Sequence, residues 1–426
     1  MLKSPSNIFD KLIYCSFVVL IFFSPLIFTT STFELFEFPK TFFLYFLGAT
    51  IILLYSIKKV QEWKVPKINI KNPINILVLG FLIINIISTL LSSHPYTSVW
   101  GYYTRFNGGL VSTIIYVFLY FISIEILTKK DFEKLLSVSL LALMPVCVYA
   151  ILQHFSQITN IYKTDPSIRV FSTFGQPNWL AAYIGMLLPI IILKIDRTKL
   201  YLWILIYTIV FSALWFTYSV SGILGFIAGT VYLLFLRKNE LKKDFKIYLI
   251  LVFISTAIAI LNPGIFEGKI LDTITDIKKI ITLNKTVLAD SSAPVYKISD
   301  TGSIRSGLWN GTLNLVFSNY KVFLIGTGPQ TFTYEFQKFR PQAMNYSSEW
   351  DFVFNKPHNY YLELWSDTGI FSLLLYLFLL VFIIRSKNYI YAPGLLALYV
   401  SNIFGWPTVA TSVLFFIFIA GLQKAE

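Results

Sequence analysis

One histidine and one arginine are the clearest chemical groups in a polar segment, 264–358, that interrupts an otherwise apolar chain. The segment carries Arg305 and ends at Pro357-His358-Asn359. An unperturbed imidazole titrates near neutral pH and can accept a proton from a substrate hydroxyl. A guanidinium binds phosphate through paired hydrogen bonds. His358 fits a general base at a membrane surface, and it equally fits a histidine that only bonds the backbone there.

Arg305 stands in the first turn of a predicted helix that begins near Ser303. A cation in the first turn opposes the helix dipole, so a purely local stabilising role does not explain it. The exposed amides at a helix start, together with the guanidinium, would suit a phosphate. Trp309, one turn later, offers a ring face for a sugar or an anchor at the membrane interface.

Gly326-Thr327-Gly328-Pro329 follows a short apolar run and precedes a predicted helix at 331–340. The pattern favours a tight turn. Gly326 and Gly328 would also let backbone amides approach an anion closely. Both interpretations are kept as hypotheses for this turn.

Two shorter segments each add one arginine. Arg105 lies among glycines and aromatic residues in 101–109, and Arg169 lies in 169–178, which ends at Asn178. Such cations also extend toward lipid headgroups without any catalytic role. If Arg105 and Arg169 converge with Arg305, the three guanidinium groups would form a clamp for pyrophosphate.

Several familiar signals are missing from the sequence. It has no glycine-rich nucleotide loop, no His and Cys at metal-ligand spacing, and no Asp-x-Asp pair in a predicted outer loop. A nucleotide sugar or an essential divalent ion therefore has no visible site. We expect neither a cofactor nor a metal.

The composition is typical of a protein with many membrane spans. Apolar residues make up 56% and charged residues 13%, and the mean hydropathy is +0.67, whereas soluble domains carry about 25% charged residues. We predict an all-α membrane protein, one integral membrane domain over 1–426, with about 12 spans and one long, partly helical loop, 264–358, between spans nine and ten. The predicted spans are 12–30, 41–57, 74–91, 110–128, 135–154, 178–195, 200–217, 220–236, 246–263, 367–384, 389–404 and 408–422. Pro393 is expected to kink the eleventh, and Gly405-Trp406-Pro407 to break the chain after it.

The distribution of basic residues predicts the orientation. Of the 35 Lys and Arg residues, 21 fall in segments that would face the cytoplasm, ten in the long loop and four in the short opposite loops. This bias puts both termini in the cytoplasm and the long loop outside. The net charge of +13 therefore reflects topology and does not indicate nucleic-acid binding. Within the long loop, an isoleucine stripe at helical spacing, 270–281, predicts an amphipathic helix on the membrane or against the spans.

Four stretches resemble the O-antigen ligase and polymerase superfamily of bacterial membrane glycosyltransferases. They are 101–109, 169–183, 305–328 and 358–369. The resemblance implies a glycan carried on polyprenyl pyrophosphate, bound at the outer face of the bacterial cytoplasmic membrane and passed to a saccharide or protein hydroxyl. It implies His358 and Arg305 as catalytic residues. Binding of the pyrophosphate or glycan would involve Arg169, Arg105, Asn178, Trp309, Gly326, Gly328 and Asn359.

One departure from the family pattern stands out. Many members carry an arginine in a Ser-Arg-Gly-like motif, where this chain has Ser219-Val220-Ser221-Gly222. The resemblance then implies that Arg105 or Arg169 supplies the charge, or that the pyrophosphate is held differently.

Different functions remain open at this stage. The acceptor could be a lipid-linked core saccharide, a growing glycan or a protein Ser or Thr. A flippase or transporter of the lipid-linked glycan, or a non-catalytic assembly partner, would also suit twelve spans. A transporter predicts charged residues deep within the spans, where the sequence offers mainly Glu125.

Overall fold

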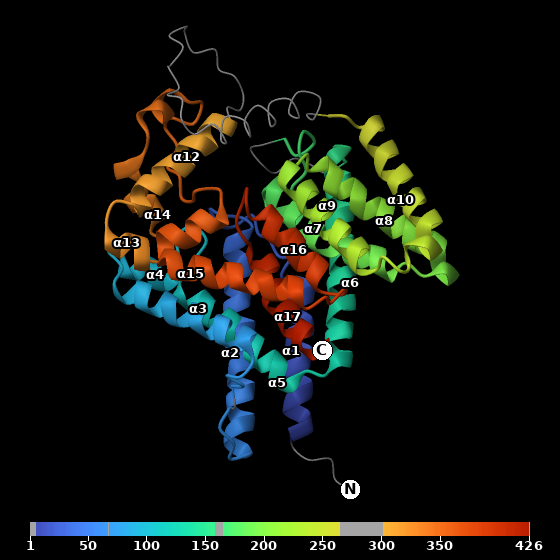
Figure 1. Ribbon diagram of the computed structural model, residues 1–426, viewed down its shortest axis with the longest axis horizontal. Helices are drawn as coiled ribbons and strands as arrows, with labels where there is room; N and C mark the ends of the chain where they lie inside the picture. The colour runs from blue at the N-terminus through green and yellow to red at the C-terminus, as the bar shows by residue number, and fades with distance from the viewer. Residues whose placement is uncertain (1–5, 67, 158–164, 265–300, 426) are drawn as a thin grey trace.

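The computed structural model describes residues 6–66, 68–157, 165–264 and 301–425. Within these residues all regular secondary structure is helical (Figure 1). The α-helices are α1 (Ser6–Phe23), α2 (Glu37–Gln61), α3 (Pro73–Leu90), α4 (Pro95–Trp100), α5 (Leu110–Ile126), α6 (Lys129–His154), α7 (Pro177–Lys194), α8 (Leu200–Phe216), α9 (Val220–Leu236), α10 (Leu241–Leu261), α12 (Thr301–Val316), α13 (Tyr320–Ile325), α14 (Phe332–Glu335), α15 (Tyr360–Arg385), α16 (Ala392–Ser401) and α17 (Val409–Ala425). Four short 3-10 helices join them: η1 (Ser172–Phe174), η2 (Arg197–Lys199), η3 (Phe336–Phe339) and η4 (Gln342–Tyr346).

Seven described helical segments are long and apolar enough to cross a membrane: α2, α3, α6, α7, η2 with α8, α10 and α15. Four shorter apolar helices, α5, α9, α16 and α17, accompany them. Each predicted span overlaps a helix, so the membrane class is as expected. The described helices nevertheless divide into long and short ones instead of twelve equal spans.

The eleventh predicted span is the clearest correction. Pro393 lies in the first turn of α16, so it starts that helix and does not kink a longer one. A proline is tolerated there because the first amides of a helix have no partner within the helix. The chain break at Gly405-Trp406-Pro407 appears as predicted, between α16 and α17.

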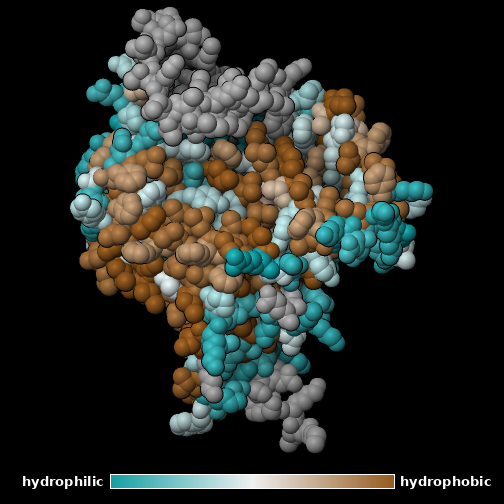
Figure 2. Space-filling view, in the orientation of Figure 1, coloured by the Kyte–Doolittle hydropathy of each residue, from teal (hydrophilic) through white to brown (hydrophobic). Residues whose placement is uncertain are grey.

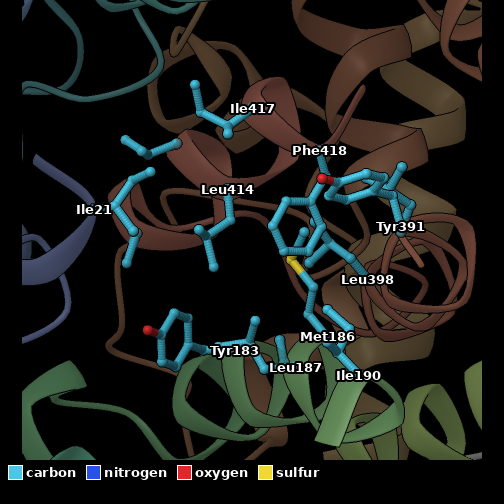
Figure 3. Packing of buried hydrophobic residues seen from close by; sticks show 14 of the residues in the cluster. Ile21, Tyr183, Met186, Leu187, Ile190, Tyr391, Leu398, Leu414, Ile417 and Phe418 are labelled. Atoms are coloured by element: carbon cyan, nitrogen blue, oxygen red, sulfur yellow. The ribbon is translucent and has the colours of Figure 1, made fainter. Parts of the chain in front are cut away.

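The core is built around α7, whose residues from Trp179 to Ile192 are all buried. Figure 3 shows Met186 and Ile190 of this helix against Leu398 of α16 and Phe418 of α17. α9 packs against both α7 and α16 and approaches α16 closely through glycines. A Cβ added at Gly225 would lie 2.5 Å from the Ala397 carbonyl oxygen. Small residues of this kind let membrane helices pack backbone to backbone.

The tenth predicted span is not a continuous helix. α15 begins at Tyr360 and breaks at Gly369, which has φ 82° and ψ 176°. A Cβ at Gly369 would lie 2.1 Å from the Leu324 carbonyl oxygen, so only glycine permits this approach. The loop after α13 docks on the break, because the amides of Thr327 and Gly328 donate to the carbonyls of Ser366 and Asp367, both at 2.9 Å.

The segment after the ninth predicted span forms a small helical subassembly beside the bundle. The predicted helix near Ser303 is α12, and its neighbours have a separate apolar core formed by Ile304, Leu308, Leu315, Val322, Phe332, Phe336, Met344 and Phe354. The predicted helix at 331–340 appears as α14 followed by η3. The isoleucine stripe at 270–281 lies outside the described residues.

The surface carries a broad apolar band across the bundle (Figure 2). Hydrophilic residues gather beyond this band, around the projecting ends of α1 and α2 in the same view. The subassembly containing α12 lies at the opposite end of the molecule from those projecting ends (Figure 1).

Candidate functional site

His358 lies in the turn that leads into α15. Its backbone has φ 55°, which is an uncommon conformation for a residue with a side chain. The next residue, Asn359, caps α15, because its Oδ1 accepts from the amides of Tyr361 at 2.9 Å and Leu362 at 3.2 Å. The cap fixes the helix start and thereby the direction of the His358 side chain.

Trp406 forms one wall beside this histidine. The two rings meet edge to face, with centroids 4.9 Å apart and planes at 79°. Trp406 also contacts Trp179 of α7, with centroids 5.7 Å apart. The Nζ of Lys356 lies 5.7 Å from the centroid of the Trp406 ring. Trp406 comes from the short break between α16 and α17, so helices far apart in sequence meet at this ring.

Arg105 reaches the same wall from the loop between α4 and α5. Its guanidinium carbon lies 4.9 Å from the Trp179 ring centroid and 5.8 Å from that of Trp406. The loop is tight because a Cβ at Gly101 would lie 2.8 Å from the Phe106 carbonyl carbon, and Gly101 has φ 92°. Nε and Nη1 of Arg105 are buried without a hydrogen-bond partner. Unsatisfied buried donors are costly, so these N–H groups are suited to an acceptor ligand.

Arg169 is held by a polar network at the start of α7. Its Nε donates to the Thr217 carbonyl at 3.0 Å and its Nη2 to Asn178 Oδ1 at 3.2 Å. The same Asn178 oxygen accepts from Ser219 Oγ at 2.8 Å. Arg169 is therefore next to the Ser219-Val220-Ser221-Gly222 stretch, where many members of the resembled family carry their arginine. Of the two arginines considered as substitutes, Arg169 is the one bonded into this network.

Arg305 enters from α12. Its guanidinium carbon lies 5.9 Å from the ring centroid of Phe404, and Trp309 stacks on the same ring with centroids 6.2 Å apart. The Trp309 Nε1 is buried without a hydrogen-bond partner. Burial, followed by the like charge of Arg305, lowers the pKa of Arg169 to about 10. The two guanidinium groups are thus close enough to repel each other.

The cations act together on His358. Burial is the main cause that lowers the pKa of this imidazole to about 3, and the positive charges of Arg305, Arg105 and Lys356 add to the effect. The histidine is consequently neutral at physiological pH and can accept a proton. An anion bound among these cations would offset their charge and make the imidazole more basic.

The sequence-predicted residues fall into two groups. His358, Arg105, Arg169, Arg305 and Asn178 converge, and Asn178 and His358 line one small pocket with Trp179 and Trp406. Gly326 and Gly328 instead contact the broken part of α15, where a Cβ at Gly326 would lie 2.3 Å from the Asp367 carbonyl. Asn359 serves as a helix cap, and Trp309 lies behind Arg305 on Phe404.

A larger cavity of about 130 Å³ lies on the other side of Trp406. Arg105, Lys356, Glu363 and Asp367 line it. In the part of the chain that the structure describes, no group of three or more His, Cys, Asp or Glu residues could hold a metal ion.

Sequence reasoning missed three residues of the site: Trp179, Lys356 and Trp406. Lys356 stood two residues before the chosen histidine, and Trp406 stood in a motif that was interpreted only as a break. Their neighbours in the sequence gave no chemical signal, since the contacts of Trp406 with Trp179 and Arg105 join segments more than two hundred residues apart.

The fold and site define a multi-pass helical membrane protein with a buried histidine under the charge of Arg305, Arg105 and Lys356. Residues 200–377 match the family model described as O-antigen ligase. This match supports the O-antigen ligase superfamily that the sequence motifs indicate. The match contains Arg305 and His358, and Arg105 and Arg169 precede it. No curated protein matches the chain.

The family indicates a ligase-like or polymerase-like role in general terms, with a lipid-linked glycan as donor and a saccharide as acceptor. The apolar helices and the family together indicate a multi-pass membrane protein.

Proposed function

We propose that the protein transfers a glycan from a polyprenyl pyrophosphate to an acceptor hydroxyl at the outer face of the bacterial cytoplasmic membrane. The observation that carries this proposal is the positive charge of Arg305 and Arg105 acting on a neutral His358, with Arg169 close to Arg305. Cations of this kind attract the diphosphate, and a neutral imidazole can accept the proton that the acceptor loses. In the proposed orientation, both termini face the cytoplasm and α12 faces outward.

The arginines would bind the pyrophosphate and stabilise the charge that it gains. As the bond between the sugar C1 and the phosphate oxygen breaks, its electron pair passes to the polyprenyl pyrophosphate. Guanidinium groups that are already in place stabilise such a leaving group without reorganisation. The unpartnered N–H groups of Arg105 support this role, because they are buried beside Trp406 and contact no protein acceptor.

His358 would act as the general base. The acceptor oxygen forms a new bond to C1 and passes its proton to the imidazole, and the released lipid keeps both phosphates. A single displacement of this kind inverts the anomeric centre and requires neither a metal nor a cofactor. Because the bound diphosphate offsets the nearby cations, the base becomes stronger when the donor is present.

The acceptor separates the close relatives of this activity. We propose an O-antigen ligase-like transfer to a saccharide acceptor, with polymerisation of a surface glycan or transfer to a protein Ser or Thr as the alternatives within the same chemistry. The test is transfer by the purified protein from a synthetic polyprenyl-pyrophosphate glycan in the presence of EDTA, with each acceptor class supplied separately. We expect a glycosylated acceptor and free polyprenyl pyrophosphate.

The matched variants are Arg305→Ala and His358→Ala, with Arg197→Ala as the control. Arg197 lies in η2, just before α8, and forms an ion pair at 3.2 Å with Asp244 in the first turn of α10. Neither residue lines the cavity or the small pocket. Loss of transfer in the first two variants and retention in the control would support the proposal. Normal transfer by His358→Ala would contradict the base assignment, and movement of the lipid across liposomes without transfer would favour a flippase.

A further inference from the structure

The larger cavity beyond Trp406 has two chemically different ends. Its apolar side chains come mainly from α3, α15 and α17. Its polar groups come from the loops, from the first turns of α15 and from other helices, including Glu37 of α2. The apolar lining includes Phe81, Leu375, Leu379, Phe415 and Phe416, and the polar lining includes Arg105, Gln330, Lys356, Glu363 and Asp367. Apart from Arg105, the groups of the polar end are not required by the transfer chemistry proposed above.

Two buried carboxylates at the polar end each use one oxygen and leave the other unpaired. Glu363 Oε1 accepts from Gln330 Nε2 at 3.1 Å and also pairs with Lys356. Asp367 Oδ2 accepts a hydrogen bond from the backbone N–H of Gln330 at 2.8 Å. The second oxygens, Glu363 Oε2 and Asp367 Oδ1, are buried without a hydrogen-bond partner. The two residues are 5% and 4% exposed, so bulk water does not compensate for the missing bonds.

The balance of charge excludes the simplest ligands. An anion at this end would meet the carboxylate of Glu363. A cation would meet Arg105 and the ammonium of Lys356, which already pairs with Glu363. A neutral ligand rich in hydroxyl groups avoids both repulsions. Its O–H groups donate to the free side-chain oxygens of Glu363 and Asp367.

We infer that the carboxylates of Glu363 and Asp367 form a binding subsite for a neutral saccharide unit. The subsite shares Trp406 and Asn402 with the small pocket beside His358. A sugar chain can therefore reach from this subsite to the proposed reaction centre. The inference rests on the proposed glycan transfer, and the saccharide belongs to either the donor glycan or the acceptor.

The experiment measures binding to the full-length protein in lipid nanodiscs. Three probes are titrated: the glycan released by mild acid from the polyprenyl-linked pool of the cells that make the protein, the deacylated surface glycolipid of the same cells, and polyprenyl pyrophosphate without sugar. Dissociation constants are obtained by calorimetry. The first two probes distinguish a donor saccharide from an acceptor saccharide, and the third tests the proposed pyrophosphate site alone.

The variants are Asp367→Asn and Glu363→Gln. Asn at 367 retains an oxygen that can accept from the backbone N–H of Gln330, so the hydrogen bond between this loop and α15 is preserved. The control is Glu335→Gln. The Glu335 carboxylate accepts a hydrogen bond from Ser93 Oγ at 2.8 Å and does not line the cavity. We expect either variant to weaken the productive saccharide probe about tenfold, the effect of one hydrogen bond to a charged group. The binding of polyprenyl pyrophosphate should be unchanged, which also shows that the variant is folded.

Two results would overturn the inference. One is wild-type saccharide affinity in a folded Asp367→Asn and a folded Glu363→Gln protein. The other is the absence of binding by both saccharide probes while polyprenyl pyrophosphate still binds. If polyprenyl pyrophosphate fails to bind and no transfer occurs, the proposed function fails separately, and the saccharide titrations still decide the inference.

Discussion

The imidazole of His358 and the indole of Trp406 meet edge to face, with ring centroids 4.9 Å apart, although 47 residues and the whole of α15 and α16 lie between them in the chain. The same indole lies beside the guanidinium of Arg105 and the ammonium of Lys356. Trp406 thus lines both the histidine pocket and the larger cavity, and the two cations beside it line the larger cavity. This ring is the structural centre of the proposed site.

Removal of this ring should disable transfer. We expect Trp406→Ala to lower kcat/KM about a hundredfold, because it removes an apolar wall and two cation–π contacts that are each worth about 0.5–2 kcal/mol. Trp406→Phe should retain more activity, since one ring face remains. The measurement is steady-state transfer, with Trp63→Ala, a residue that is 95% exposed, as the control. Equal activity of Trp406→Ala and the control would refute the assigned role.

The arginines should also bind a diphosphate that lacks both lipid and sugar. We expect inorganic pyrophosphate to inhibit transfer competitively with the donor. Replacement of Arg105, Arg169 or Arg305 by Gln should weaken this inhibition by about tenfold or more for each charge, since hydrogen bonds to charged groups contribute about 1.5–3 kcal/mol. Inhibition constants provide the measurement, and Arg197→Gln provides the matched control. Unchanged inhibition in all three variants would place the pyrophosphate elsewhere.

The pH dependence of transfer should differ between the free protein and the donor complex. The pKa of His358 is lowered to about 3 by burial and then by Arg305, Arg105 and Lys356. The profile of kcat/KM reports the free protein. Protonation of His358 should therefore cause no loss of kcat/KM between about pH 5 and 8, the range in which an unperturbed imidazole titrates. The profile of kcat reports the complex, where bound diphosphate offsets the cations, and its inflection should lie at higher pH. Identical inflections in both profiles would contradict this coupling.

The same shift should affect stability in acid. His358 is neutral in the folded protein, whereas the unfolded chain binds a proton below about pH 6.5. Its contribution to stability is therefore fully present above pH 6.5 and is lost as the pH falls toward 3. The loss is about 1.4 kcal/mol per pH unit within this window. Thermal unfolding at pH 7 and pH 5 measures it, and we expect His358→Gln to show the smaller fall in Tm. A larger fall in the variant would be inconsistent with the shift.

The broken helix α15 can be tested independently of activity. Gly369→Ala adds a Cβ that would lie 2.1 Å from the Leu324 carbonyl oxygen, at a residue with φ 82°. We expect a loss of about 2 kcal/mol or more in stability, because both the clash and the backbone strain oppose the folded state. Gly405→Ala is the matched control, since its Cβ would lie 3.7 Å from the nearest atom. Thermal unfolding of the two variants is the measurement, and equal stability would show that α15 adapts to a side chain.

The sequence predicted the apolar helices well because a membrane leaves the backbone few alternatives. With no water in the bilayer core, each segment must satisfy its own amides and carbonyls, and so every predicted span overlaps a helix. The limits of these helices were less predictable. Neither the break in α15 nor the short α16 follows from hydropathy, since each depends on backbone packing against a neighbouring segment at Gly369 or Gly225.

By itself, the sequence determined the all-helical membrane class, the superfamily and the identities of His358, Arg105, Arg169 and Arg305 as candidate groups, because composition and local motifs are properties of short stretches. Only the tertiary structure decided which groups meet. It assigned Asn359 to a helix cap, directed Gly326 and Gly328 to α15, and brought Trp406 beside His358. It also left the second oxygens of Glu363 and Asp367 without partners in the larger cavity. Such contacts join distant segments. Burial and the nearby cations then fix the charge state of the histidine, and burial also sets the need of each free polar atom for a ligand.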